Sequence, residues 1–144
     1  MSVLWFDGLL AQVSDAGVYF LPEEDIDELL EAAAVNRFPC LRVNLRGCHA
    51  RDDLLLRLAG MLALPPHVVE GWADVPAAIG QARPAGAPGM VLLLEHSEDL
   101  RAQAREEFKQ AMESLQAASA DWATRGLPLW SFIVVDEDEF DALG

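Results

Sequence analysis

The three histidines and two cysteines are the side chains best suited to metal binding or nucleophilic chemistry. His49, His67 and His96 lie far apart, and none stands at a metal-ligand spacing from another histidine or from a cysteine pair. Zinc sites bring cysteine and histidine ligands together at short, regular spacings, so the adjacent Cys48 and His49 alone are a weak zinc signal. With only these two cysteines, Cys40 and Cys48 are expected to be structural thiols in a reducing compartment. We therefore expect no metal site.

The acids Glu95, Glu98 and Asp99 lie close together where a strand is expected to lead into a helix. Acids at such a junction generally serve helix capping and solvation. The sequence contains no P-loop, dinucleotide-binding glycine pattern or nucleophile elbow. Its glycine-containing loop at 86–89 leads into a strand, whereas phosphate-binding glycines open a helix. We expect no cofactor and no catalytic residues, so the sequence favours a binding protein over an enzyme.

The charge of the chain is strongly negative and unevenly distributed. The net charge is −14, residues 1–36 hold eight acids and no lysine or arginine, and residues 136–144 add five acids. Proteins bind nucleic acid largely through lysine and arginine on its phosphates, so direct binding to nucleic acid is not expected. The field would instead attract a basic protein partner. The alternative interpretation is that the acidity serves only to keep the protein soluble.

Length and hydropathy fit one domain with a core of its own. The chain has 144 residues, of which 52% are hydrophobic, and a chain of this size can bury a substantial core. No apolar run approaches the ~20 residues of a membrane helix. Residues 1–17 lack a basic leader, and Asp7 interrupts their apolar part. We expect a cytoplasmic protein without a membrane segment, and the sequence leaves its oligomeric state open.

The last third of the chain predicts a strand, a long helix and a second strand. Residues 89–96 and 129–135 are mostly apolar runs, and Ser97 is expected to cap the helix between them. Parallel strands need a crossover of about a dozen or more residues, usually a helix, so this segment predicts a helix-covered parallel sheet and an α/β fold. The apolar face of the helix recurs at spacings of three and four and comprises Leu100, Ala104, Phe108, Ala111, Leu115, Ala118 and Trp122.

The earlier part of the chain predicts further strands and helices. Asp74 is expected to cap a short helix that contains Pro76 in its first turn. Residues 67–88 are the least regular part of the chain, so we expect the binding surface there. The expected elements are a strand at 17–21 ended by Pro22, a helix at 23–36, a strand at 40–45, a turn at 46–49, a helix from Asp52 that stops at Leu64, Pro65 and Pro66, and the short helix at 75–82.

From about Pro39 to Val135, the order and spacing of these elements resemble the barstar family, small acidic intracellular inhibitors of barnase-type ribonucleases. The segments that carry the resemblance are 41–45, the leucine-rich helix closing at 64–65, 89–96, and the helix end at 122–126. The resemblance implies a three-layer fold with a parallel three-stranded sheet covered by helices. It divides the chain into an N-terminal strand–helix extension at 1–38, as in longer barstar-like bacterial proteins, a barstar-like domain at 39–135 and an acidic tail at 136–144.

The resemblance also implies where a partner would bind. In the family, the inhibitory surface follows the proline as an aromatic pair, a glycine, Asn, an apolar residue and Asp-Ala-Leu, with another Asp four residues after the first. Counted from Pro65 with Trp72 as anchor, His67 and Val68 stand at the aromatic pair. Trp72 is then either an interface anchor or a packing residue, and His67 either stacks on the partner or is solvated.

The two family aspartates, which occupy the phosphate site of the nuclease, match Ala73 and Ala77 here. Glu70 and Asp74 lie one position from where an acid is expected, and Asp121, near the end of the long helix, matches a position where the family can carry an acid facing the nuclease. Affinity for a barnase-like enzyme should be weak unless Glu70 and Asp74 substitute. The expected partner-binding residues are His67, Val68, Glu70, Trp72, Asp74 and Asp121.

Three classes of function remain open from the sequence. The first is a barstar-like inhibitor or immunity protein that blocks a basic toxin, such as a ribonuclease, through an acidic loop–helix surface. The second is a non-inhibitory structural or regulatory binding protein on the same scaffold, acting through the acidic N-terminal region or tail. The third, an enzyme, would need a reactive site that the sequence does not display.

Overall fold

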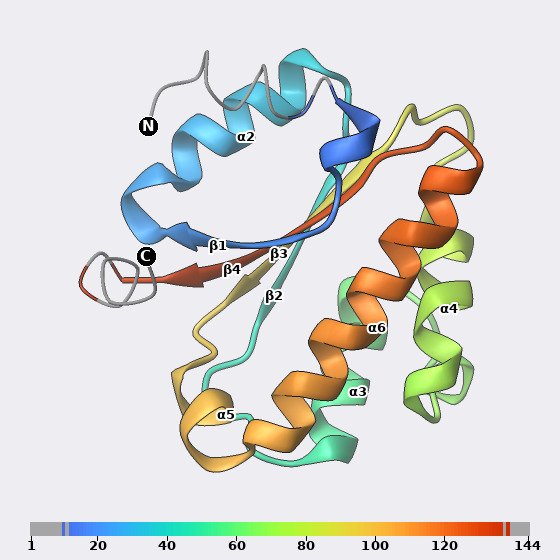
Figure 1. Cartoon of the computed structure of the whole chain (residues 1–144). Coiled ribbons are helices and arrows are strands. Elements are labelled where there is room, and N and C mark those ends of the chain that lie inside the picture. The colour runs from blue at the N-terminus through green and yellow to red at the C-terminus, as the bar shows by residue number, and fades with distance from the viewer. Residues whose placement is uncertain (1–9, 11, 137, 139–144) are drawn as a thin grey trace.

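The structure is a computed structural model that describes residue 10, residues 12–136 and residue 138, without the side chain of residue 14 (Figure 1). Each strand and helix expected from the sequence is present at the expected place, with changes at several helix ends and one interruption, in the long helix. In chain order the elements are η1 (Val13–Asp15), β1 (Val18–Pro22), η2 (Glu23–Asp25), α2 (Ile26–Val35), β2 (Cys40–Asn44), α3 (Arg51–Met61), η3 (Pro66–Val68), η4 (Trp72–Asp74), α4 (Val75–Ala82), β3 (Met90–Glu95), α5 (Glu98–Gln103), α6 (Arg105–Thr124) and β4 (Leu129–Val135), where η marks a single 3₁₀ turn.

The four strands form one all-parallel sheet in the order β1-β4-β3-β2. The expected α/β fold is confirmed, and β1 joins the three expected strands as a fourth, with Val18 opposite Ser131 and Pro22 opposite Val135. The two central strands, β3 and β4, are buried along almost their whole length. Strands buried on both faces read as nearly continuous apolar runs, which explains their sequences.

Helices cover both faces of the sheet, so the molecule has the expected three layers. Figure 1 shows α2 on one face and α3, α4 and α6 on the other. Because side chains alternate along a strand, β4 contributes to two cores. Leu129 and Ile133 belong to the larger core under α3, α4 and α6, whereas Trp130, Phe132 and Val134 belong to the smaller core under α2.

Helix α3 ends earlier than expected. It stops at Met61, and Ala63 adopts a left-handed backbone with φ of 56°. The Leu64 N–H donates to the Ala59 carbonyl at 3.0 Å and the Ala63 N–H donates to the Gly60 carbonyl at 3.1 Å. These two bonds form a Schellman closure. The helix is therefore terminated before it reaches the prolines at 65 and 66, and the expected stop there was wrong.

The expected long helix is interrupted at Ala104, which separates α5 from α6 with φ of −138°. The expected capping by Ser97 was also wrong, because its hydroxyl makes no cap bond and instead accepts a hydrogen bond from Arg101 Nε at 3.0 Å. The apolar face still reaches the core. Its buried members are Leu100, Ala111, Leu115, Ala118 and Trp122, and its partly buried members are Ala104 and Phe108.

The expected acidic tail at 136–144 lies, except for Asp136 and Asp138, outside the described residues. Among the described residues, no helix combines the length and the apolar character that crossing a membrane requires.

Candidate functional site

The chain between α3 and α4 carries five of the six expected partner-binding residues. In residues 66–74, which we call the 66–74 segment, Val69 is buried at 4% exposure and Val75, just beyond, at 1%. The segment is thus anchored to the core at two points. Between and before these anchors His67 and Glu70 are exposed, and Val68 is partly buried. The segment therefore exposes polar side chains to solvent while apolar side chains hold it to the core.

Asp74 organises this segment from within. Its Oδ2 accepts hydrogen bonds from the backbone N–H of Glu70 at 3.1 Å and of Gly71 at 3.2 Å. The expected capping of α4 by Asp74 was wrong, because that helix has no side-chain cap bond. The carboxylate instead stabilises the turn that precedes it, since an ionised acceptor strengthens a hydrogen bond from a backbone N–H.

Arg51, the first residue of α3, ties the segment to that helix. Its Nη2 donates to the Glu70 carbonyl at 3.1 Å, and its Nη1 donates to Asp52 Oδ1 at 3.1 Å. A Cβ added at Gly71 would lie 3.3 Å from the same guanidinium, so glycine permits this close approach. A cation is thus placed among the acids of the surface, where it offsets part of their repulsion.

Trp72 lies half-buried against the larger core. Its carbonyl accepts a hydrogen bond from Ser114 Oγ of α6 at 3.4 Å, and its buried indole Nε1 has no hydrogen-bond partner among the described residues. A buried indole N–H normally finds an acceptor. This placement accords with the packing role considered from the sequence, and it fixes the 66–74 segment to α6.

Asp121 lies apart from the other five residues. It is exposed on the last turn of α6, where its Oδ2 pairs with Arg125 Nη2 at 2.6 Å. Asp121 follows Ser114 by seven residues, so it stands about 10 Å along the helix axis from the contact between Ser114 and Trp72. The structure thus groups His67, Val68, Glu70, Trp72 and Asp74 and leaves Asp121 on the neighbouring helix.

A shallow groove of about 390 Å³ separates the 66–74 segment from α3. Sequence reasoning missed its α3 wall, of which Leu56 is 52% exposed. The sequence contained a signal for this exposed leucine, because three consecutive leucines at 54–56 of one helix cannot all face the protein core. The groove is lined mainly by Asp52, Leu55, Leu56, Pro66, His67 and Glu70.

The two cysteines are poorly suited to chemistry. Both are free thiols. Burial raises the pKa of Cys40 to about 11 and also raises the pKa of Cys48. Each is therefore protonated and weakly nucleophilic at neutral pH. The described part of the chain has no cluster of three side chains that could hold a metal ion.

The carboxyl ends of the strands, where open α/β sheets commonly bind ligands, carry acids engaged in structural contacts. Glu95 accepts two hydrogen bonds from Arg42, at 3.0 and 2.6 Å, across β3 and β2. Asp99 accepts the Gly47 N–H at 3.1 Å. These bonds tie the ends of the strands and the adjoining turns together, which is a structural task rather than acid–base chemistry.

The comparisons with known proteins agree with the fold. The family model described as Barstar (barnase inhibitor) matches residues 38–134, which is more than half of the chain and runs from just before β2 into β4. No curated protein matches the chain. Members of the matched family are non-enzymatic inhibitors, and membership implies a barnase-like ribonuclease as partner. The family match covers more than half of the chain, and the parallel sheet between helices agrees with it, so the chain belongs to the barstar family.

Proposed function

We propose that this protein is an inhibitor or immunity protein that blocks a basic, ribonuclease-like toxin in the cytoplasm. The binding surface would comprise the 66–74 segment, the exposed side of α3 beside it, and Asp121. The observation that carries the proposal is that the segment is fixed to the core while its acids are exposed to solvent. Val69 and Val75 hold the segment to the core, while Glu70 and Asp74 stay exposed. A preorganised loop loses little conformational entropy when it binds.

Glu70 supplies the most available negative charge of this surface. Its carboxylate makes no hydrogen bond or ion pair among the described residues, although its backbone N–H and carbonyl are both engaged. Asp74 uses Oδ2 for the turn and leaves Oδ1 for a partner. These two acids would replace the pair expected at Ala73 and Ala77. A few hot-spot side chains carry most of the binding energy of an interface, each worth about 2 kcal/mol or more, so the shifted acids should also shift partner preference within the family.

The test measures inhibition of a barnase-type ribonuclease, and of any toxin encoded beside this gene, by the full chain and by variants. Glu70→Gln removes the available charge, and Asp74→Asn removes a charge while keeping an acceptor for the turn. Both should slow association and reduce its dependence on salt, because complementary charge acts mainly on the association rate. The matched control is Glu31→Gln, the same change at an exposed position of α2 on the other face of the sheet.

Two results would contradict the proposal. The first is equal inhibition by the parent chain, Glu70→Gln and Asp74→Asn. The second is a loss of inhibition in Glu31→Gln as large as in Glu70→Gln, which would place the interface on the other face of the molecule.

A non-inhibitory structural or regulatory role on the same scaffold is the second candidate. The observation that favours it is the presence of Ala73 and Ala77 where the family carries acids. Neighbouring genes distinguish the two, since an adjacent toxin gene supports immunity and an adjacent metabolic or regulatory operon supports the second role.

A further inference from the structure

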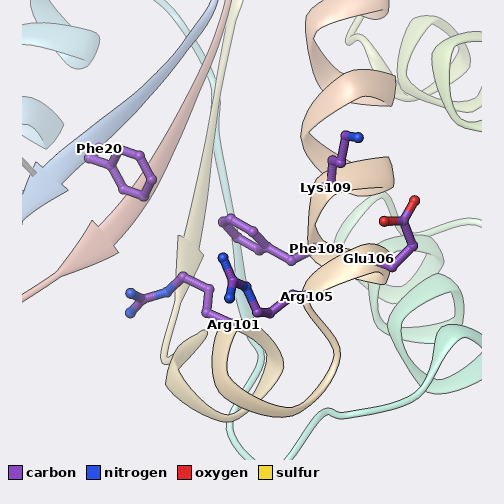
Figure 2. A pocket seen from close by; sticks show the side chains of 6 residues that line it. All are labelled: Phe20, Arg101, Arg105, Glu106, Phe108 and Lys109. Carbon is purple, nitrogen blue, oxygen red and sulfur yellow. The ribbon is translucent and has the colours of Figure 1, made fainter.

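A second surface, away from the 66–74 segment, combines positive charge with aromatic rings. It is a hollow of about 570 Å³ lined by Phe20 of β1, Arg101 of α5, and Arg105, Glu106, Phe108 and Lys109 of α6. We call it the cation–aromatic groove (Figure 2). Figure 1 shows β1 and α4 on opposite sides of α6, so the groove and α4 flank this helix from different sides.

The aromatic part of the groove arises where the helical layer leaves β1 uncovered. Leu21 lies in the smaller core and Val18 packs against the larger one. By strand alternation Phe20 shares the face of Val18, yet it remains 37% exposed. Figure 2 shows the rings of Phe20 and Phe108 on opposite sides of the gap between β1 and α6. An apolar side chain inserted there would be covered from both sides.

Arg101 is tied to the fold by its hydrogen bond to Ser97 Oγ, whereas the other two cations of the groove are not used in this way. Arg105 and Lys109 make no hydrogen bond or ion pair within the described part of the chain, although the chain contains 24 acids and only ten basic residues. Arg105 is also the first residue of α6, where the helix macrodipole disfavours a cation. Four other arginines are paired with acids: Arg42, Arg51, Arg57 and Arg125.

We propose that the cation–aromatic groove binds a short acidic peptide segment of a partner protein, with one aromatic side chain between Phe20 and Phe108. Carboxylates of the segment would pair with Arg105 and Lys109, since guanidinium and ammonium groups are strong donors to carboxylates. Nucleic acid offers phosphates and rings too, but its long run of negative charge is repelled by a chain of net charge −14. A short segment with a few carboxylates meets mainly the local positive field.

This inference does not depend on the proposed inhibitory function, and it adds a second binding surface to the molecule. The 66–74 segment presents acids to a basic partner, whereas the groove presents cations to an acidic one. One molecule could therefore hold both partners at the same time.

Lys109 provides a direct probe because it is the only lysine of the chain. Reductive methylation of the full-length protein with ¹³C-formaldehyde labels a single side-chain amine, whose NMR signal is distinct from that of the labelled N-terminus. The ligand is the synthetic peptide acetyl-Glu-Asp-Glu-Phe-Asp-amide, which has the acidic and aromatic side chains that the proposal requires and is identical to residues 137–141 of this chain. We expect saturable shifts of the Lys109 signal, affinity at least about tenfold lower in Arg105→Glu, and similar losses for peptides with serine in place of phenylalanine or amides in place of acids. Arg37→Glu, the same charge change at an exposed site on the loop after α2, is the matched control and should bind normally.

Each of several results would overturn the inference. The Lys109 signal could fail to saturate, or binding could be unchanged in Arg105→Glu or equally weakened in Arg37→Glu. Inorganic phosphate could produce the same shifts at the same concentration, which would indicate a simple anion site. Finally, replacing the five acids at 136–141 by amides could shift the Lys109 signal without any peptide, which would assign the groove to the chain's own C-terminal sequence.

Discussion

Replacing Gly89 with alanine tests the junction of the two central strands. Gly89 is buried immediately before β3, and the next residue, Met90, donates its N–H to the Pro128 carbonyl just before β4 at 3.1 Å. A Cβ at Gly89 would lie 2.7 Å from that carbonyl oxygen, 2.8 Å from Pro128 Cγ and 2.9 Å from Phe38 Cε1. All three distances are shorter than real Cβ contacts, so the strands must separate or the proline must move.

The expected destabilisation is about 3 kcal/mol. Overpacking a core usually costs about 1–3 kcal/mol, and the upper end applies because one clash is with backbone and another with a proline ring. The matched control is Gly80→Ala in α4, where the new Cβ has no atom within 4 Å. Alanine inside a helix is favoured over glycine by about 0.5–1 kcal/mol, so Gly80→Ala should stabilise the protein.

The measurement is equilibrium unfolding in urea, followed by tryptophan fluorescence and by circular dichroism. Gly89→Ala should lower the midpoint and Gly80→Ala should raise it, with the slope of the transition unchanged in both. The reasoning is refuted if Gly89→Ala is as stable as the parent chain, or if the two substitutions shift the midpoint in the same direction.

Three further predictions concern buried polar groups, a helix end and a thiol. The hydroxyl of Ser131 is fully buried without a partner among the described residues, whereas that of Ser119 donates to the Leu129 carbonyl at 2.7 Å. In thermal unfolding, Ser131→Ala should leave the free energy of unfolding unchanged or raise it by about 1 kcal/mol, whereas Ser119→Ala should lower it by about 1–2 kcal/mol. The opposite order of stability would contradict this reasoning. Ala63→Gly should raise the free energy of unfolding, measured in urea, by about 0.5–1 kcal/mol, because glycine tolerates the left-handed backbone that ends α3. A loss of stability would exclude this explanation. Burial raises the pKa of Cys40 from 9.0 to about 11, so the unfolded chain releases this proton at lower pH than the folded chain. The free energy of unfolding should fall as the pH rises through that interval, and urea unfolding of Cys40→Ala should show a smaller fall than the parent.

The sheet could be predicted from the sequence because its signals are local and strong. The apolar runs at β3 and β4, and the long amphipathic stretch between them, allow few alternatives to a parallel pair with a helical crossover. The strand at β1 was also predictable from its composition. Its position beside β4 was not, because pairing between segments more than a hundred residues apart leaves no local signal.

Helix ends and side-chain partners were harder to predict, because they depend on competition between nearby acceptors. A left-handed alanine at Ala63 ends α3 without the usual glycine, so the prolines were the only visible stop signal. Asp74 had the right type and position to cap α4, yet two N–H groups on its other side bind the carboxylate instead. The exposure of Leu56 depends on how neighbouring elements pack, and so does the lack of a partner for Arg105 among the described residues.

The pairing of β1 with β4 also determines when the protein can fold on the ribosome. The strand made first lies beside the strand made last, and β4 separates it from β3. During translation, β1 and α2 have no sheet edge to join until residues 129–135 have left the exit tunnel. The small core under α2 must therefore close after synthesis of most of the chain, and any nascent chain that stalls before β4 exposes apolar surface from both cores to chaperones and proteases.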